Sequence, residues 1–219
     1  MFPALTDFVA LAGVAVVACA GCLRLSGLMF TTADQANAKG RWLVGICFVM
    51  MWIPVGAAHL PVAAYLRGVT SDFSVTLVVL AALNLFSRLF SLKLFDRREC
   101  QAVFYVVAAT ALFLYPLALG WGDWDAYRPG WGSAGMWAGL LFLCLGCWVA
   151  GLRLLPLLIG VAMLSWTARV MESTNLWDYL IDPWIATAVI FKSGAAAATQ
   201  LRGHFRRKKN VGKITGEII

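Results

Sequence analysis

Long apolar stretches recur along the whole chain and are separated by short polar segments. A helix needs roughly 20 mostly apolar residues to cross the hydrocarbon core of a bilayer. Seven stretches fit this pattern, at about 8–30, 42–66, 73–95, 100–120, 133–150, 154–170 and 180–201. The fifth and sixth are divided at Gly151–Arg153, because an unbroken apolar run from 134 to 170 is too long for one crossing. The pattern predicts an all-α, polytopic transmembrane bundle of about seven spans in one domain (1–201), followed by a tail (202–219).

The composition supports a membrane protein. Hydrophobic residues make up 61% of the 219 residues, and charged residues only 13%. Soluble globular domains usually carry about 45–50% apolar and about 25% charged residues. The polar residues are too few to cover a water-facing surface, which excludes an ordinary soluble domain. Disorder is excluded as well, because it requires low hydrophobicity and high net charge.

Lys and Arg predict the orientation of the bundle, because cytoplasmic loops carry an excess of both. One set of loops and the tail together hold twelve basic residues: Lys39, Arg41, Lys93, Arg97, Arg98, Arg153, Arg202, Arg206, Arg207, Lys208, Lys209 and Lys213. The opposite set holds only Arg67, Arg128 and Arg169. We therefore expect the N-terminus outside and the C-terminus in the cytoplasm. The small size of the chain favours the inner membrane of a bacterium.

The predicted outer loops are acidic and rich in aromatic residues. Trp and Tyr favour the membrane interface, where an apolar ring can keep one polar atom hydrated. We predict partner or lipid contacts at six residues. They are Trp121, Trp124, Tyr127 and Trp131 in the longest outer loop, with Arg88 and Lys192, which can reach the inner interface from within their spans.

The outer face also carries the residues that could support chemistry. Arginines there would bind an anionic group, and a carboxylate or His59 would move a proton. His59 lies between Pro54 and Pro61, which are expected to kink the second span. Arg169 and Glu172 are spaced to pair on one helix, Asp182 and Pro183 resemble a helix start, and Ser71 and Asp72 can cap the third span. The candidates are His59, Arg67, Asp72, Asp123, Asp125, Arg128, Arg169, Glu172 and Asp178.

Four of the six cysteines form two CxxC pairs, Cys19 with Cys22 and Cys144 with Cys147. At similar depth in two spans, the pairs could relay electrons by thiol–disulfide exchange or hold a thiophilic metal. Against this, a thiolate is disfavoured in the middle of an apolar helix, where cysteine packs as a small apolar residue. We therefore expect no metal site and see no evident cofactor, with the four-cysteine site as the alternative.

Three functions remain open from the sequence. The first is an integral subunit or scaffold of a larger cell-envelope complex, in contact with lipids and other membrane subunits. The second is a small enzyme or carrier that acts on a lipid-linked or small polar substrate at the outer face. The third is the intramembrane thiol or metal protein. The basic tail suits anionic lipid rather than nucleic acid, and whether the protein is an enzyme stays open.

Overall fold

The computed structural model describes residues 5–26, 33–195 and 199, with side chains left out at 33–39. The described chain is mostly helical, which confirms the all-α class. Its elements in order are α1 (Leu5–Ser26), α2 (Ala33–Met51), β1 (Pro54–Val55), β2 (Leu60–Pro61), α3 (Val62–Thr70), α4 (Val75–Leu89), α5 (Arg97–Ala118), η1 (Arg128–Trp131), α6 (Ala134–Val149), α7 (Leu154–Thr167) and α8 (Leu176–Leu180). Residues 183–195 are also helical. The predicted tail (202–219) lies outside the described residues.

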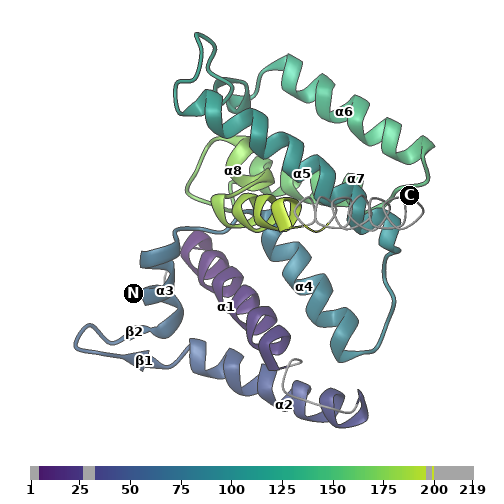
Figure 1. Cartoon of the computed structure of the whole chain (residues 1–219). Helices are drawn as coiled ribbons and strands as arrows, with labels where there is room; N and C mark the ends of the chain where they lie inside the picture. The colour runs from purple at the N-terminus through teal and green to yellow at the C-terminus, as the bar shows by residue number, and fades with distance from the viewer. Residues whose placement is uncertain (1–4, 27–32, 196–198, 200–219) are drawn as a thin grey trace, which may run out of the picture.

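Helix α4 lies between two groups of helices (Figure 1). On one side it packs against α1, which also contacts α2 and α3. On the other side it packs against α7 and α8, and α7 also contacts α5 and α6. The larger core belongs to this second group and includes the fully buried Leu114, Leu158, Leu176 and Tyr179.

Side-chain caps explain where several helices begin. Ser74 precedes α4 and accepts a hydrogen bond from the Leu77 amide at 3.1 Å, and Ser133 accepts one from the Met136 amide of α6 at 3.2 Å. Each serine oxygen satisfies an amide that has no partner within its own helix. At the start of α5, the Asp96 amide donates to Glu99 Oε2 at 3.1 Å. The third predicted span is thus capped by Ser74, and not by Ser71 or Asp72.

The second predicted span is interrupted. Helix α2 ends at Met51, and the chain then forms an antiparallel hairpin of two strands with two residues each, in which Pro54 pairs with Pro61. Proline lacks the amide hydrogen that a continuing helix needs and disfavours helical geometry at the residue before it. The hairpin is tied to α3 by the Tyr65 hydroxyl, which donates to the Val55 carbonyl at 3.0 Å. The prediction of a kinked helix over 42–66 was therefore wrong.

Seven crossings are not confirmed. Among the described residues, only α1 and α5, with 22 residues each, are long and apolar enough to cross a membrane. Helices α4, α6 and α7 have 15, 16 and 14 residues, which is below the usual 17–25. The last predicted span (180–201) is divided by extended residues between α8 and the helix at 183–195. Residues 27–30, 196–198 and 200–201 of the predicted spans lie outside the described part.

Candidate functional site

Arg67 on α3 binds three carboxylates from separate parts of the chain. Its Nη1 lies 2.8 Å from Asp7 Oδ1 on α1, and its Nη2 lies 2.8 Å from Glu172 Oε1, just beyond α7. Asp72, which follows α3, accepts from Nε at 2.6 Å and from Nη2 at 3.3 Å. The planar guanidinium suits this arrangement, because its donors point in fixed directions. The carboxylates, led by Asp72, raise the pKa of Arg67 above its ordinary value, so this residue is a permanent cation.

A second polar group lies beside Arg67 and its partners. Asp178 on α8 accepts one hydrogen bond from the Tyr127 hydroxyl and another from the Ser173 hydroxyl. Burial, followed by the bond to Asp178, raises the pKa of the Tyr127 phenol above its ordinary value. Tyr179 is fully buried, and its hydroxyl accepts from the Met171 amide at 3.2 Å and donates to the Ser173 carbonyl at 3.0 Å. These bonds fix the segment between α7 and α8 against the outer loop.

Asp182 joins the starts of two helices. Its Oδ2 accepts from the Ser74 amide at 2.8 Å, and its Oδ1 accepts from the Ile185 amide at 2.8 Å. The side chain is buried, with 4% of the residue exposed. A carboxylate is favourable there, because helix N-termini carry unpaired amides and a positive partial charge. The predicted role of Asp182 at the start of the last helix is confirmed by the bond from Ile185.

Arg67 and its partners, Asp178 with its partners and Asp182 line one large cavity, to which α1, α3 and α8 all contribute. Its volume is about 1070 Å³, at the upper end of ordinary ligand pockets. We call it the polar cavity. Its charged residues are Arg67 and five carboxylates, Asp7, Asp72, Glu172, Asp178 and Asp182, and the hydroxyls of Tyr115, Tyr127 and Ser173 also line it. Five carboxylates against one guanidinium give a negative field, which attracts cations and repels anions.

Four of the nine predicted outer-face candidates line the polar cavity, namely Arg67, Asp72, Glu172 and Asp178. The prediction that Arg67 is free to bind an anionic group is not supported, because its donors already contact carboxylates. Glu172 pairs with Arg67 on another helix. The predicted Arg169–Glu172 pair is not the one that the described residues form. Arg169 lies just after α7 with a left-handed φ of 53°, and this turn ends the helix that the pair required.

The remaining predicted candidates lie elsewhere. Asp123 and Asp125 line a separate hollow of about 520 Å³ formed by residues 117–127, where Asp125 Oδ1 accepts from the Tyr127 amide at 2.8 Å. Arg128 lines another hollow with Trp124 and Trp131. His59 is exposed on the hairpin between β1 and β2, with φ 49°. The hairpin removes it from the membrane helix in which the sequence pattern placed it.

Sequence reasoning missed five polar residues of the polar cavity as site residues, namely Asp7, Ser71, Tyr115, Ser173 and Asp182. A signal was present for Asp7, because it is an acidic residue in the first turn of a long apolar helix. Tyr127, which was predicted to contact lipid or a partner, lines the polar cavity and donates its hydroxyl to Asp178. No pattern along the chain brings residues 7, 67 and 172 together, since these contacts span 60 and 105 positions.

The other residues predicted to contact lipid or partners lie on the surface. Trp121 is 76% exposed, Trp124 packs on Phe113 with ring centroids 5.7 Å apart, and Trp131 meets the Tyr127 ring edge-on at 5.5 Å. Arg88 on α4 and Lys192 in the last described helix are also exposed. These side chains are exposed and could contact lipid or a partner, and the contacts stay predictions.

The two CxxC pairs do not form one site. Cys19 and Cys22 on α1 face α2, where Cys47 Sγ lies 3.6 Å from Cys22 Sγ. Cys144 and Cys147 belong to α6, which packs against α7, and α4 lies between α7 and α1 (Figure 1). In the described part of the chain, no group of three or more His, Cys, Asp or Glu residues is arranged to hold a metal ion. The described residues therefore do not bring the four cysteines together as one metal site, and a role for either pair in thiol exchange stays a prediction.

Comparison with known proteins adds no family to these observations. No protein-family model matches the sequence, and neither a curated protein nor a solved structure matches the chain. The function therefore has to be inferred from the class of the fold and from the chemistry of the cavity.

Proposed function

We propose that this chain is an integral membrane protein whose polar cavity binds the neutral or cationic polar group of a substrate at the outer face, as a carrier or a small enzyme. The observation that carries the proposal is the excess of five carboxylates over one guanidinium in a cavity of about 1070 Å³. Because Arg67 already binds three of those carboxylates, a further anionic group would meet repulsion. Amines and hydroxyls would instead find carboxylate acceptors.

The surface of the long helices supports insertion in a membrane. In the most apolar 18-residue stretch of each helix, only 28% of the residues of α1 and 22% of those of α5 are buried inside the molecule. The core helix of a soluble protein would bury most of such a segment. Helix α6 likewise exposes Phe142, Trp148 and Val149 by 73%, 74% and 88%. Large apolar side chains exposed in such number are typical of a membrane or protein interface.

The position of the cavity agrees with the orientation expected from the basic residues. The start of α1, α3 and the segment 171–183 all border it, and the sequence places all three at the outer ends of predicted spans. Lys93 precedes α5, Arg97 begins α5 and Arg153 immediately precedes α7, at the opposite ends of the predicted spans. Glu99 Oε1 accepts from the Arg153 amide there at 2.9 Å. We therefore propose a cavity that faces the outside of a bacterial inner membrane.

A direct test uses small soluble probes of different charge. The protein is reconstituted in nanodiscs, and thermal unfolding is followed with ethanolamine, glycerol or methyl phosphate at equal ionic strength. Ligand at ten times its dissociation constant stabilises a protein by about 1.4 kcal/mol, which raises the melting temperature of a chain of this size by about 3–6 °C. We expect this shift with ethanolamine, a smaller one with glycerol and none with methyl phosphate.

Two variants make the test specific to the cavity. Asp178→Asn removes one charge without breaking an ion pair, and it should reduce the ethanolamine shift at least by half. Asp123→Asn removes a charge from the separate hollow and should leave the shift unchanged. Equal thermal shifts with ethanolamine and methyl phosphate would contradict the proposal. An equal loss of the ethanolamine shift in Asp178→Asn and Asp123→Asn would contradict it as well.

The exposed apolar face of α6 favours a second candidate, the subunit or scaffold of a larger envelope complex. Phe142, Trp148 and Val149 on this face could contact another membrane protein instead of lipid. Native mass spectrometry after gentle extraction distinguishes the two. Other subunits in a fixed ratio would support the complex, whereas a lone protein with a small adduct would support a site of its own.

A further inference from the structure

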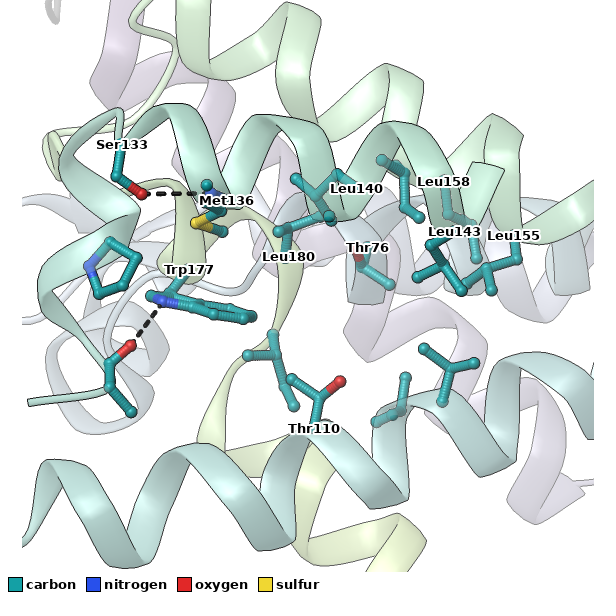
Figure 2. A pocket seen from close by; sticks show the side chains of 18 of the residues that line it. Thr76, Thr110, Ser133, Met136, Leu140, Leu143, Leu155, Leu158, Trp177 and Leu180 are labelled. Carbon is teal, nitrogen blue, oxygen red and sulfur yellow. Dashed lines mark hydrogen bonds between the residues drawn. The ribbon is translucent and has the colours of Figure 1, made fainter. Parts of the chain in front are cut away.

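A second cavity lies between α5 and α6 and is almost entirely apolar. Its volume is about 430 Å³, within the range of ordinary ligand pockets. We call it the apolar cavity. Figure 2 shows Leu140 and Leu143 of α6 and Leu155 and Leu158 of α7 around it, with Thr110 of α5 on the opposite wall. From Gly135 to Leu143 its lining follows α6, over about 12 Å along the helix.

The apolar cavity adjoins the polar cavity, because Trp177 and Ile181 line both. The Trp177 ring is held in place, since its Nε1 donates to the Ala126 carbonyl at 3.1 Å (Figure 2). Beyond this ring, on the side of the polar cavity, lies Asp178 with its two hydroxyl partners. A hydrocarbon pocket and a carboxylate-rich pocket therefore share one wall.

Water is a poor occupant of the apolar cavity. A buried water needs two to four polar partners. Two of the hydroxyls that line the cavity are already engaged, since Thr76 donates to the Tyr179 carbonyl at 3.4 Å and Ser133 caps α6. The remaining lining is dominated by Leu, Val, Ile and Met side chains. Such a surface is stabilised by hydrocarbon rather than by water.

Helix α6 also provides a lateral opening. Gly135 and Gly139 line the cavity and are exposed, and a Cβ at either position would meet no atom within 4 Å. The two missing side chains leave space between the cavity and the surroundings of α6, which the proposed function identifies as lipid. A chain can therefore enter from the side without passing through the polar cavity.

From these contacts, and resting on the proposed function, we infer that the substrate is an amphiphile. Its hydrocarbon chain occupies the apolar cavity, and its neutral or cationic headgroup occupies the polar cavity across Trp177. The repulsion of anions by the five carboxylates excludes amphiphiles with only a phosphate as headgroup. The ligand class is thus a lipid-linked amine or sugar, bound with its chain between α5 and α6.

Photo-crosslinking tests this inference. Three probes share a twelve-carbon chain with a terminal diazirine and differ in the headgroup, which is an amine, a glucoside or a phosphate. With protein in nanodiscs, the amine and glucoside probes should label peptides of α5 and α6 that line the apolar cavity, and excess unlabelled amphiphile should suppress this labelling. The phosphate probe should label them about tenfold less, which corresponds to about 1.4 kcal/mol of discrimination.

Gly139→Phe places a bulky side chain at the border of the apolar cavity, where the hydrocarbon chain would enter, and should abolish the saturable labelling. Gly146→Phe is the matched control, because Gly146 lies on the same helix, has equally free space and does not line the cavity. Gly135→Leu provides an independent block. Retention of the ethanolamine shift shows that each variant is folded and that the polar cavity still works. Undiminished labelling in folded Gly139→Phe and Gly135→Leu would overturn the chain site while leaving the proposed function in place.

Asp178→Asn then distinguishes one shared ligand from two separate ones. If headgroup and chain belong to one molecule, this variant lowers labelling by the amine probe toward the level of the phosphate probe. Equal labelling by all three probes, unchanged in Asp178→Asn, would overturn the shared ligand and assign the apolar cavity to ordinary bilayer lipid. An unchanged ethanolamine shift in the same variant would be the separate failure of the proposed function.

Discussion

At the scale of single residues, the three carboxylates around Arg67 differ in exposure. The Asp72 side chain is 19% exposed and makes two hydrogen bonds to the guanidinium, whereas the Glu172 side chain is 65% exposed and makes one. Solvent screens an exposed ion pair and leaves it worth about 0–1 kcal/mol. Loss of a less exposed, charge-assisted bond costs about 1–3 kcal/mol. The three partners are therefore unequal, although each lies within 2.8 Å of Arg67.

We predict that Asp72→Asn lowers the free energy of unfolding by about 1–3 kcal/mol, and that Glu172→Gln lowers it by less than about 1 kcal/mol. Denaturant unfolding of both variants beside the unmodified protein measures the difference. Equal losses would show that exposure does not govern the strength of these pairs.

Tyr127 gives a prediction about pH. Burial and its bond to Asp178 raise its pKa above the ordinary value, which is about 10 in the unfolded chain. A raised pKa in the folded state means that the stabilisation is complete below about pH 10 and is lost as the pH rises through the folded value. Tyr127→Phe should therefore be less stable than the unmodified protein by a constant amount up to about pH 10. The gap should close at higher pH. Thermal unfolding between pH 8 and pH 11.5 measures it, and a gap that widens above about pH 10 would refute the assignment.

At the scale of elements, the outer loop is joined to α8 by a close approach at Gly130. A Cβ on Gly130 would lie 2.7 Å from Trp177 Cδ1 and would overlap the Asn175 side chain. Asn175 is buried, caps α8 through the Trp177 amide at 2.9 Å and donates to the Tyr127 carbonyl at 3.1 Å. Any side chain at position 130 must displace these bonds.

Gly130→Ala should therefore destabilise the protein by about 1–3 kcal/mol, the usual effect of leaving buried polar groups without partners. Gly146→Ala serves as its control, since nothing lies within 4 Å of that position. Thermal unfolding of the two variants provides the comparison. If Gly130→Ala were as stable as Gly146→Ala, the contact between the loop and Asn175 would not hold the site.

The same elements show what the sequence could predict. Periodicity and caps are local, so the helical class and the start of the last helix at Asp182 could be predicted from short stretches of sequence. The hairpin at 54–61 was missed, because apolar residues continue through it and hide the effect of the two prolines. The polar cavity was only partly found, since Asp7, Arg67 and Glu172 meet through tertiary packing that leaves no spacing along the chain.

At the scale of the whole molecule, the proposed orientation predicts different accessibility at the two ends of the bundle. Ala58 is exposed on the hairpin, and Lys93 is exposed in the turn between α4 and α5. In a cysteine-free background, Ala58→Cys should react with a membrane-impermeant maleimide in intact cells. Lys93→Cys should react only after the membrane is opened.

The pattern of maleimide labelling also distinguishes the opposite topology and a protein that is not inserted in the membrane. The reverse result would invert the topology and place the polar cavity in the cytoplasm. Reaction of both cysteines only after lysis, with the protein in the soluble fraction, would contradict membrane insertion. The native protein with its six cysteines serves as the reference for reactive endogenous thiols.

The carboxylate that joins two helix starts has a consequence for how the chain is made. Ser74 and Asp182 are 108 positions apart, and the Trp184 indole, which donates to the Thr70 carbonyl at 3.0 Å, bridges 114 positions. Since translation proceeds from the N-terminus, α1, α3 and α4 leave the ribosome well before the residues that complete the polar cavity. The polar cavity is thus completed only in the last stage of biosynthesis, and a nascent chain arrested before Glu172 lacks three of its five carboxylates.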